Sequence, residues 1–250
     1  MGTIESKAGE NNYITKIKEI INELTSLLKN RFFYIGLAVL IAGIQLNFLS
    51  QTYLNQYVSE GKSLPTLSDI ILDNLPYWDI DFLYDIFSLV SIFTITIYIL
   101  HKRKYSIIPY VLLLCGIFHL TRGVFIVLTP LGNPSMFDGT QGLFNGFSKY
   151  ELGVYPSGHV GIAYLYFILC SDKYYKTILL SSVVVIIGAL FLSRGHYSID
   201  VLSGIFFAYA IKAFGDNRLK HFFVRQRNDS LHKNKQRQTV LIHLNNIENQ

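Results

Sequence analysis

The segment VYPSGHVGIAYLYFILC, residues 154–170, joins a Pro-Ser-Gly-His turn directly to an apolar stretch that is suited to lipid. The environment of this histidine depends on whether the chain lies in water or in a lipid bilayer. Charged residues make up only 16% of the 250 residues, hydrophobic residues make up 50%, and the mean hydropathy is +0.32. Because soluble domains carry about 25% charged residues, this composition predicts an integral membrane protein.

Six apolar runs divide the chain, and most are close to the ~20 residues that cross a bilayer. They lie at 32–49, 82–100, 107–129, 160–170, 176–193 and 197–214. The fourth run is short and needs its flanking turn to complete a crossing. The pattern predicts an all-α fold, a polytopic membrane helix bundle with about six transmembrane helices. A soluble protein with several buried helices is the alternative, which uncharged runs of this length disfavour. The first run is also too long for the apolar core of a cleaved signal peptide, so we expect it to stay as a span.

Lys and Arg are sorted by loop, and this sorting predicts the orientation. They gather before the first run, in the segment HKRK at 101–104, and in the tail after the sixth run. By the positive-inside rule these segments are cytoplasmic, so both termini are expected in the cytoplasm. The loops 50–81 and 130–156 and the turn at 193–196 then face the outside or a lumen. The net charge of +5 therefore reflects topology, and we expect no nucleic-acid partner.

Three parts follow from this pattern. They are a cytoplasmic amphipathic N-terminal segment (1–31), a six-span membrane domain with the candidate catalytic site (32–214) and a basic cytoplasmic tail (215–250). Apolar residues of the first part recur at helical spacing: Ile14, Ile17, Ile21, Leu24 and Leu28. This favours either a helix on the membrane surface or an extension of the first span. Cys115 and Cys170 lie inside predicted spans, so no disulfide framework is expected.

Two histidines and a carboxylate are predicted to meet at the outer face. His159 stands where the chain turns into the fourth run, and LSRGHYSIDVLSG at 192–204 places His196 and Asp200 at the outer start of the sixth. Ionisable residues that gather at one depth near lipid indicate a functional site. His196 and Asp200 are four residues apart, so on a helix they would stack within hydrogen-bond reach. Asp200 would then orient His196 as nucleophile or base, and His159 would act as general acid.

The neighbouring residues favour a phosphate as the group that is attacked. Ser157 and Gly158 open a helix whose first backbone N–H groups favour an anion. Arg122 lies about 15 residues into the third run, roughly 23 Å along a helix and level with the outer site. Arg194 lies two residues before His196. We therefore expect these four residues to bind substrate, since guanidinium groups and amides stabilise a phosphoryl transition state.

Alternatives remain open for several of these residues. Arg122 could make a structural ion pair inside the bundle, and Arg194 could reach lipid head groups. His119 is expected to pack or to support the site from behind. A metal site built from the two histidines and Asp200 is an alternative, since such a set binds metals. We expect neither a metal nor a cofactor, and the many aromatic residues are expected in interfacial belts and in helix packing.

The motifs resemble those of a known family. PSGH at 156–159, followed by a His-x-x-x-Asp at the next outer helix, resembles the type 2 phosphatidic acid phosphatase superfamily, and HYSIDV at 196–201 resembles the sphingomyelin synthase branch. Arg122 with the following TPLGNP is similar to the third helix of that branch. The resemblance implies a phosphohistidine mechanism, with His196 as nucleophile, Asp200 as its partner and His159 as acid and base. GVYP replaces the Cys-Gly-Asp that precedes Ser-Gly-His in animal sphingomyelin synthases, and no Lys-x6-Arg-Pro element is present.

The expected function is transfer of a phospho-head group from a phospholipid donor to a lipid alcohol such as ceramide or diacylglycerol, at the outer or lumenal surface. Hydrolysis of a lipid phosphate by the same residues is the first alternative. A non-catalytic membrane transporter or scaffold is the second, and the gathering of ionisable residues at one interface disfavours it. The expected partners are these lipid substrates and the surrounding membrane lipids. The sequence indicates no oligomeric state.

Overall fold

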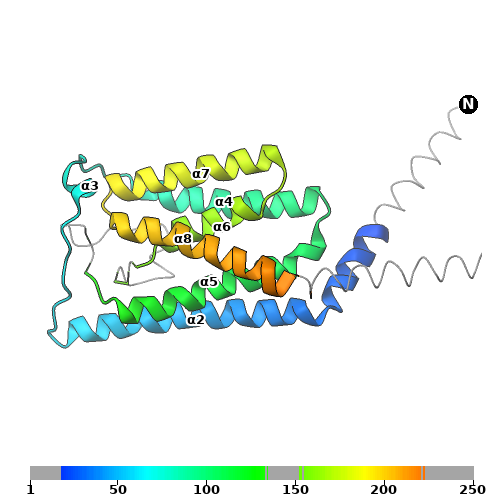
Figure 1. Ribbon diagram of the computed structural model, residues 1–250, viewed down its shortest axis with the longest axis horizontal. Helices are drawn as coiled ribbons and strands as arrows, with labels where there is room; N and C mark the ends of the chain where they lie inside the picture. Colours follow the sequence, from blue (N-terminus) through cyan, green and yellow to red (C-terminus); the bar gives the residue numbers. More distant parts are fainter. Residues whose placement is uncertain (1–17, 133, 135–151, 154, 221, 223–250) are drawn as a thin grey trace, which may run out of the picture.

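The computed structural model describes residues 18–132, 134, 152–153, 155–220 and 222. Within this part of the chain the fold is a helix bundle without strands, as predicted (Figure 1). The elements are α2 (Arg31–Ser59), α3 (Ile70–Asp73), α4 (Phe82–His101), a 3-10 turn (Tyr105–Ile107), α5 (Ile108–Leu128), α6 (Gly158–Leu169), α7 (Lys173–Leu192), α8 (Ser198–Phe214) and a π-helical turn (Gly215–Leu219).

Five helices in the described residues are long and apolar enough to cross a membrane. They are Arg31–Ser59, Phe82–His101, Tyr105–Leu128, Lys173–Leu192 and Ser198–Leu219. The chain is therefore a multi-pass membrane protein with a polytopic helical fold. Each of the six predicted runs corresponds to one helix, and the helix of the fourth run, α6, is too short to be among these five.

Helix α6 has only 12 residues, about 18 Å, whereas the hydrocarbon core is about 30 Å thick. It lies at the centre of the bundle and packs against α4, α5, α7 and α8. Irregular backbone at membrane depth is tolerated only where protein covers it. Gly153, Pro156 and Ser157, which precede α6, are buried, so protein covers the described irregular backbone at the start of this short central helix.

Helix α2 is longer than the apolar run predicted, because it continues from residue 49 to Ser59. The predicted run ended at residue 49 because Ser50 is polar, but the hydroxyl of Ser50 is hydrogen-bonded inside the bundle. Ser50 Oγ donates to the carbonyl oxygens of Leu46 (2.7 Å) and Gly123 (2.8 Å). The two helices approach closely: a Cβ on Gly116 would lie 2.6 Å from the backbone nitrogen of Leu40. Small residues at such contacts are typical of helix pairs in membranes.

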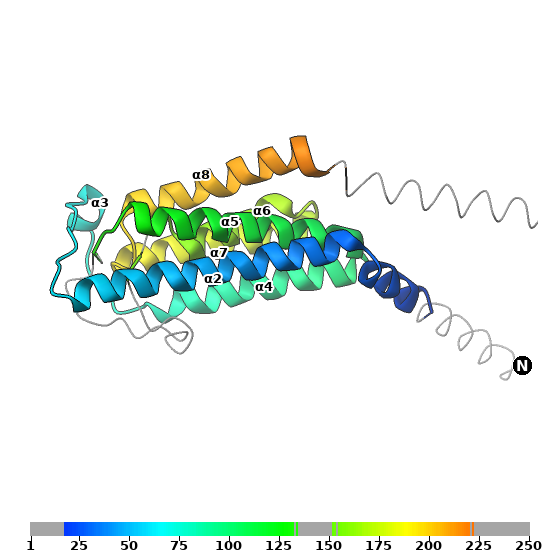
Figure 2. The same ribbon diagram turned by 90° about the horizontal axis from the view of Figure 1, so that it is seen from below.

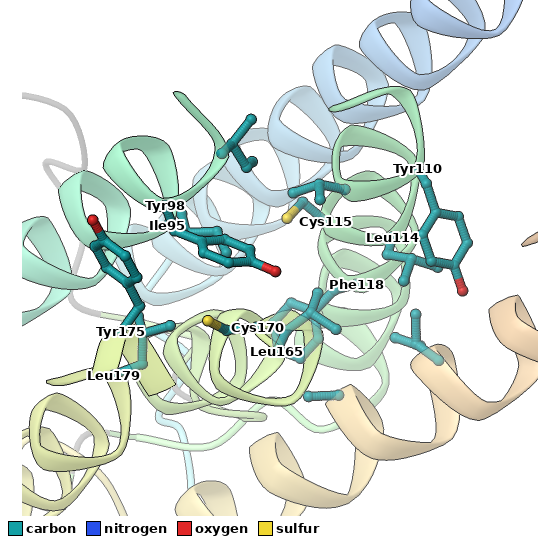
Figure 3. Close-up of a cluster of buried hydrophobic side chains, with 14 residues drawn as sticks. Ile95, Tyr98, Tyr110, Leu114, Cys115, Phe118, Leu165, Cys170, Tyr175 and Leu179 are labelled. Atoms are coloured by element: carbon teal, nitrogen blue, oxygen red, sulfur yellow. The ribbon is translucent and has the colours of Figure 1, made fainter. Parts of the chain in front are cut away.

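A packed apolar cluster fills the space between the helices of the bundle (Figure 3). It joins five helices, with Tyr98 from α4, Phe118 from α5, Leu165 from α6 and Leu179 from α7 among its fully buried members. Both cysteines are free and buried in this cluster.

The helix of residues 18–28 and the end of α8 lie at one end of the bundle, and α3 lies at the opposite end (Figures 1 and 2). Residues 18–28 form a helix that stops before Asn30, whose side chain caps α2 by accepting from Phe32 N (3.0 Å). The segment is therefore separate from the first span, and its first 17 residues lie outside the described part, as does nearly all of the tail. The side of the membrane that each end faces stays a prediction.

Candidate active site

His196 and Asp200 meet at the junction of α7 and α8. Asp200 is the third residue of α8, and its Oδ2 accepts from Tyr197 N (2.9 Å) and lies 3.4 Å from His196 Nδ1. Asp200 is fully buried and His196 is 5% exposed. His196 itself precedes the helix, so the expectation that both residues lie on one helical face was wrong. They meet because Asp200 folds back over the start of its helix to cap it.

His159, the second residue of α6, pairs with a carboxylate that the sequence analysis missed. Its Nε2 lies 3.2 Å from Oδ1 of Asp85, which comes from the first turn of α4. Asp85 is 3% exposed. It is a lone carboxylate inside the second apolar run, and the rule applied to the histidines, that ionisable residues in apolar spans are functional, would have found it.

The rings of His159 and His196 lie close to each other. Their centroids are 6.3 Å apart, and the ring of Tyr84 lies 4.9 Å from that of His159. The His159 side chain is 36% exposed and that of His196 only 7%. One histidine meets its carboxylate through Nε2 and the other through Nδ1. The nitrogens left for chemistry are therefore Nε2 of His196 and Nδ1 of His159.

Arg122 holds the loop before α6. Its Nε donates to Pro156 O (2.9 Å), one terminal nitrogen to Gly153 O (3.0 Å), and the other to Asn47 Oδ1 (2.7 Å). The two backbone oxygens belong to buried residues of irregular chain, where each needs a donor. A guanidinium has five N–H groups, so two remain for an anion. The partners are neutral oxygens and not the ion pair considered above.

Ser157 and Gly158 join α6 to the other parts of the site. Ser157 is fully buried, caps α6, and donates its backbone N–H to Asp200 O (3.0 Å). A Cβ on Gly158 would lie 3.2 Å from Arg122 Nε, so this glycine lets the guanidinium approach the helix start. Substrate binding by these residues stays a prediction. The buried Ser157 hydroxyl faces its own helix, so any anion contact would come from backbone N–H groups of the first turn.

Arg194 occupies a position where glycine is usual. It follows α7 with φ 55°. Arg194 N donates to Phe191 O (3.3 Å) and Gly195 N to Leu190 O (2.9 Å), which is the pattern of a Schellman motif with Arg194 at its left-handed residue. A non-glycine residue in this conformation is strained by about 1–2 kcal/mol. Such strain is concentrated at functional sites.

Three buried polar atoms have no hydrogen-bond partner among the described residues. They are Asp85 Oδ2, Arg194 Nε and Asp200 Oδ1. Native proteins leave few buried polar atoms unpaired. All three belong to the pairs and the turn described above, so the unsatisfied groups of the described chain coincide with the candidate site.

Burial sets the protonation of His196. It lowers the pKa of this imidazole below its ordinary value, with smaller contributions from the charges of His159 and Arg122, and the Asp200 carboxylate only partly opposes the shift. The neutral form, which carries a lone pair on one nitrogen, is therefore favoured near neutral pH.

His119 packs against α2, where its backbone oxygen accepts from Asn47 Nδ2 (2.5 Å). No group of three or more His, Cys, Asp or Glu that could hold a metal ion occurs in the described part of the chain. His159 and His196 are paired with different carboxylates, Asp85 and Asp200.

No protein-family model matches the chain, and a search of curated proteins finds no match either. The resemblance to sphingomyelin synthases rests on the motifs at 157–159 and 196–201.

Proposed function

We propose that the chain is a membrane phosphotransferase that moves a phospho-head group from a phospholipid donor to a lipid alcohol, ceramide or diacylglycerol, through a phosphohistidine on His196. The observation that carries the proposal is the pair of facing histidines, 6.3 Å apart between centroids, each with its own buried carboxylate. The family resemblance of the two histidine motifs agrees with it.

In the first half of the reaction, Nε2 of neutral His196 attacks the donor phosphorus. The new N–P bond forms as the P–O bond to the lipid alcohol breaks. His159, in its charged form, gives the proton on Nδ1 to the departing oxygen, and Asp85 stabilises the charged imidazole before this transfer. Asp200 accepts from His196 Nδ1–H, holds the tautomer and stabilises the positive charge that develops on the ring.

In the second half, the hydroxyl of the acceptor lipid attacks the same phosphorus. His159 removes the hydroxyl proton as the O–P bond forms, and the N–P bond to His196 breaks. Both histidines return to their starting states. In the phosphatase alternative, water takes the place of the acceptor hydroxyl and every other step is the same.

Arg194 is the favoured ligand of the phosphoryl oxygens. It lies two residues from the nucleophile, its Nε has no partner in the described chain, and its backbone conformation is strained. Arg122 contributes two further N–H groups, and the first turn of α6 contributes backbone amides. Together these groups would neutralise the charge of a transferring phosphoryl group.

The burial of His196 favours a lipid acceptor over water. A phosphohistidine on a side chain that is 7% exposed is shielded from bulk water. In this proposal the acceptor lipid reaches His196 from the bilayer. The more exposed His159 is suited to exchange protons in both half-reactions.

The test uses the purified full-length chain and phospholipid labelled in its head-group phosphate, with and without ceramide or diacylglycerol. We expect a new labelled lipid that appears only with the acceptor and only with His196 intact, so His196→Gln is the control. A labelled water-soluble product without new lipid, a phospho-head group or inorganic phosphate according to the donor, would establish hydrolysis by the same residues instead. No conversion of any labelled phospholipid or lipid phosphate would refute phosphoryl transfer.

A further inference from the structure

The chain between α2 and α4 is tied to the turn that carries His196. We name residues 64–78, LPTLSDIILDNLPYW, the strap. Leu67 N donates to Tyr197 Oη (3.1 Å), Ser198 N donates to Asp69 Oδ2 (2.6 Å), and Trp78 N donates to Leu192 O (2.9 Å). The strap therefore follows the junction of α7 and α8 at three points.

One face of the strap is buried against this junction. Leu72 packs on Tyr197, which is itself almost fully buried. Asp69 caps two helices at once, because Oδ1 accepts from the start of α3 while Oδ2 accepts from the first residue of α8. These contacts fix the direction in which the rest of the strap points.

The other face is apolar and exposed. Ile70 is 81% exposed, the largest value among the exposed large hydrophobic residues of the described chain, and Leu67, Ile71 and Trp78 are exposed too. The strap contains no Lys or Arg, and its only charged residues are Asp69 and Asp73. An apolar surface of this kind in water is a liability unless something covers it.

The depth of the strap indicates what covers it. Helix α2 has 29 residues, about 43 Å, which matches the ~40–45 Å of a bilayer with its head groups and exceeds the ~30 Å of the hydrocarbon core. Both views place α3 at the end of the bundle where α2 ends and α8 begins (Figures 1 and 2). That end lies at the level of the head groups, where Trp is the preferred anchor.

We infer that the strap is a lipid-contacting surface, with Ile70, Ile71 and Trp78 inserted into the head-group layer of the leaflet at the site end, and that it holds the His196 turn at that depth. Insertion is apolar in origin, because the strap offers no positive charge to anionic lipids. It should therefore occur in pure phosphatidylcholine and persist at high salt.

Trp78 is the only tryptophan of the chain, so it reports on the strap directly. The full-length protein is reconstituted in phosphatidylcholine vesicles brominated either near the head-group end or near the methyl end of the acyl chains. We expect blue-shifted Trp78 emission, strong quenching by the shallow bromines, weaker quenching by the deep ones, and little by aqueous iodide. Ile70→Asp should shift the emission to the red and increase iodide quenching, whereas Ile70→Leu should leave both unchanged.

Phe206→Trp in a Trp78→Phe background is the matched control, since Phe206 is exposed in the middle of α8 and should be quenched best by the deep bromines. Iodide quenching of Trp78 without lipid quenching would overturn the proposal. So would protection from both quenchers, which would indicate a second copy of the chain on the strap. None of these measurements depends on activity, so they stand or fall independently of the proposed phosphotransferase.

Discussion

Asp85 on α4 and His159 on α6 form a carboxylate–imidazole pair across the bundle, with 3.2 Å between Oδ1 and Nε2. The carboxylate is buried and its second oxygen has no partner in the described chain, whereas the imidazole is partly open. This pair gives the second histidine a charge partner of its own, separate from the one that serves His196.

Asp85→Asn should slow turnover by about tenfold or more, since a hydrogen bond to a charged group contributes about 1.5–3 kcal/mol. The double variant with His159→Ala should be no slower than His159→Ala alone, because both changes remove the same function. Steady-state turnover of the four proteins in this cycle measures the coupling. Asp79→Asn, an exposed carboxylate before α4, is the control and should be silent. Additive losses would show that Asp85 does not act through His159.

The roles of the two histidines are separable by trapping the intermediate. A labelled donor quenched in mid-turnover should leave acid-labile, base-stable label on the protein, and His196→Ala should abolish it. His159→Ala should retain the attachment site but slow labelling by about 10²–10⁴-fold, as for a general acid. A donor with a more acidic leaving alcohol should partly rescue only the His159 variant. Label on His159, or rescue of the His196 variant, would reverse the assignment.

Arg194→Gly should raise the stability of the protein and lower its turnover. Glycine removes about 1 kcal/mol or more of left-handed strain at the end of α7, so thermal unfolding should move upward. Turnover should fall, because the phosphoryl group loses its free guanidinium. Arg194→Lys keeps the strain and a positive charge, and should retain more activity at unchanged stability. Full activity in the glycine variant would remove Arg194 from the site.

Arg122→Lys should cost stability as well as turnover. A lysine cannot reach Gly153 O, Pro156 O and Asn47 Oδ1 together, and each buried carbonyl left without a donor costs about 1–3 kcal/mol. Unfolding in detergent measures the loss, and Lys102→Ala, which breaks an exposed pair with Asp172, should show none. Loss of turnover with unchanged unfolding would mean that Arg122 serves only the substrate.

The pH dependence follows from the lowered pKa of His196. The unfolded chain takes up the proton at the ordinary value of about 6.5, whereas the folded chain takes it up only at lower pH. The contribution of His196 to the free energy of unfolding is therefore fully present above about pH 6.5 and is lost as the pH falls below that value. The acid limb of kcat/KM should likewise lie below pH 6.5. Unfolding of the wild type and of His196→Gln across this range isolates the contribution, and parallel curves would contradict it.

The helices were predictable because lipid imposes a length and a composition on each span. The far end of α2 was not, since Ser50 is polar in sequence but its hydroxyl is satisfied against α5. The His196–Asp200 contact was predictable from spacing, although a cap and not a helical face produces it. Asp85 could have been found as a lone carboxylate in an apolar run, but its pairing with His159 could not, because the two residues lie 74 positions apart. Sequence spacing also could not separate the roles of the two arginines. Arg122 is held by backbone carbonyl oxygens, whereas Arg194 is marked by its positive φ.

The apolar cluster around Tyr98, Phe118 and Leu165 closes the bundle between the histidines and the HKRK turn. In the proposed reaction, this packed core of the described chain would keep lipid head groups from reaching the histidines from that side, so donor, acceptor and products would enter and leave by the leaflet at the site end. Each turnover would alter the composition of one monolayer and leave the other untouched, so the chain would generate transbilayer asymmetry with no flipping step of its own.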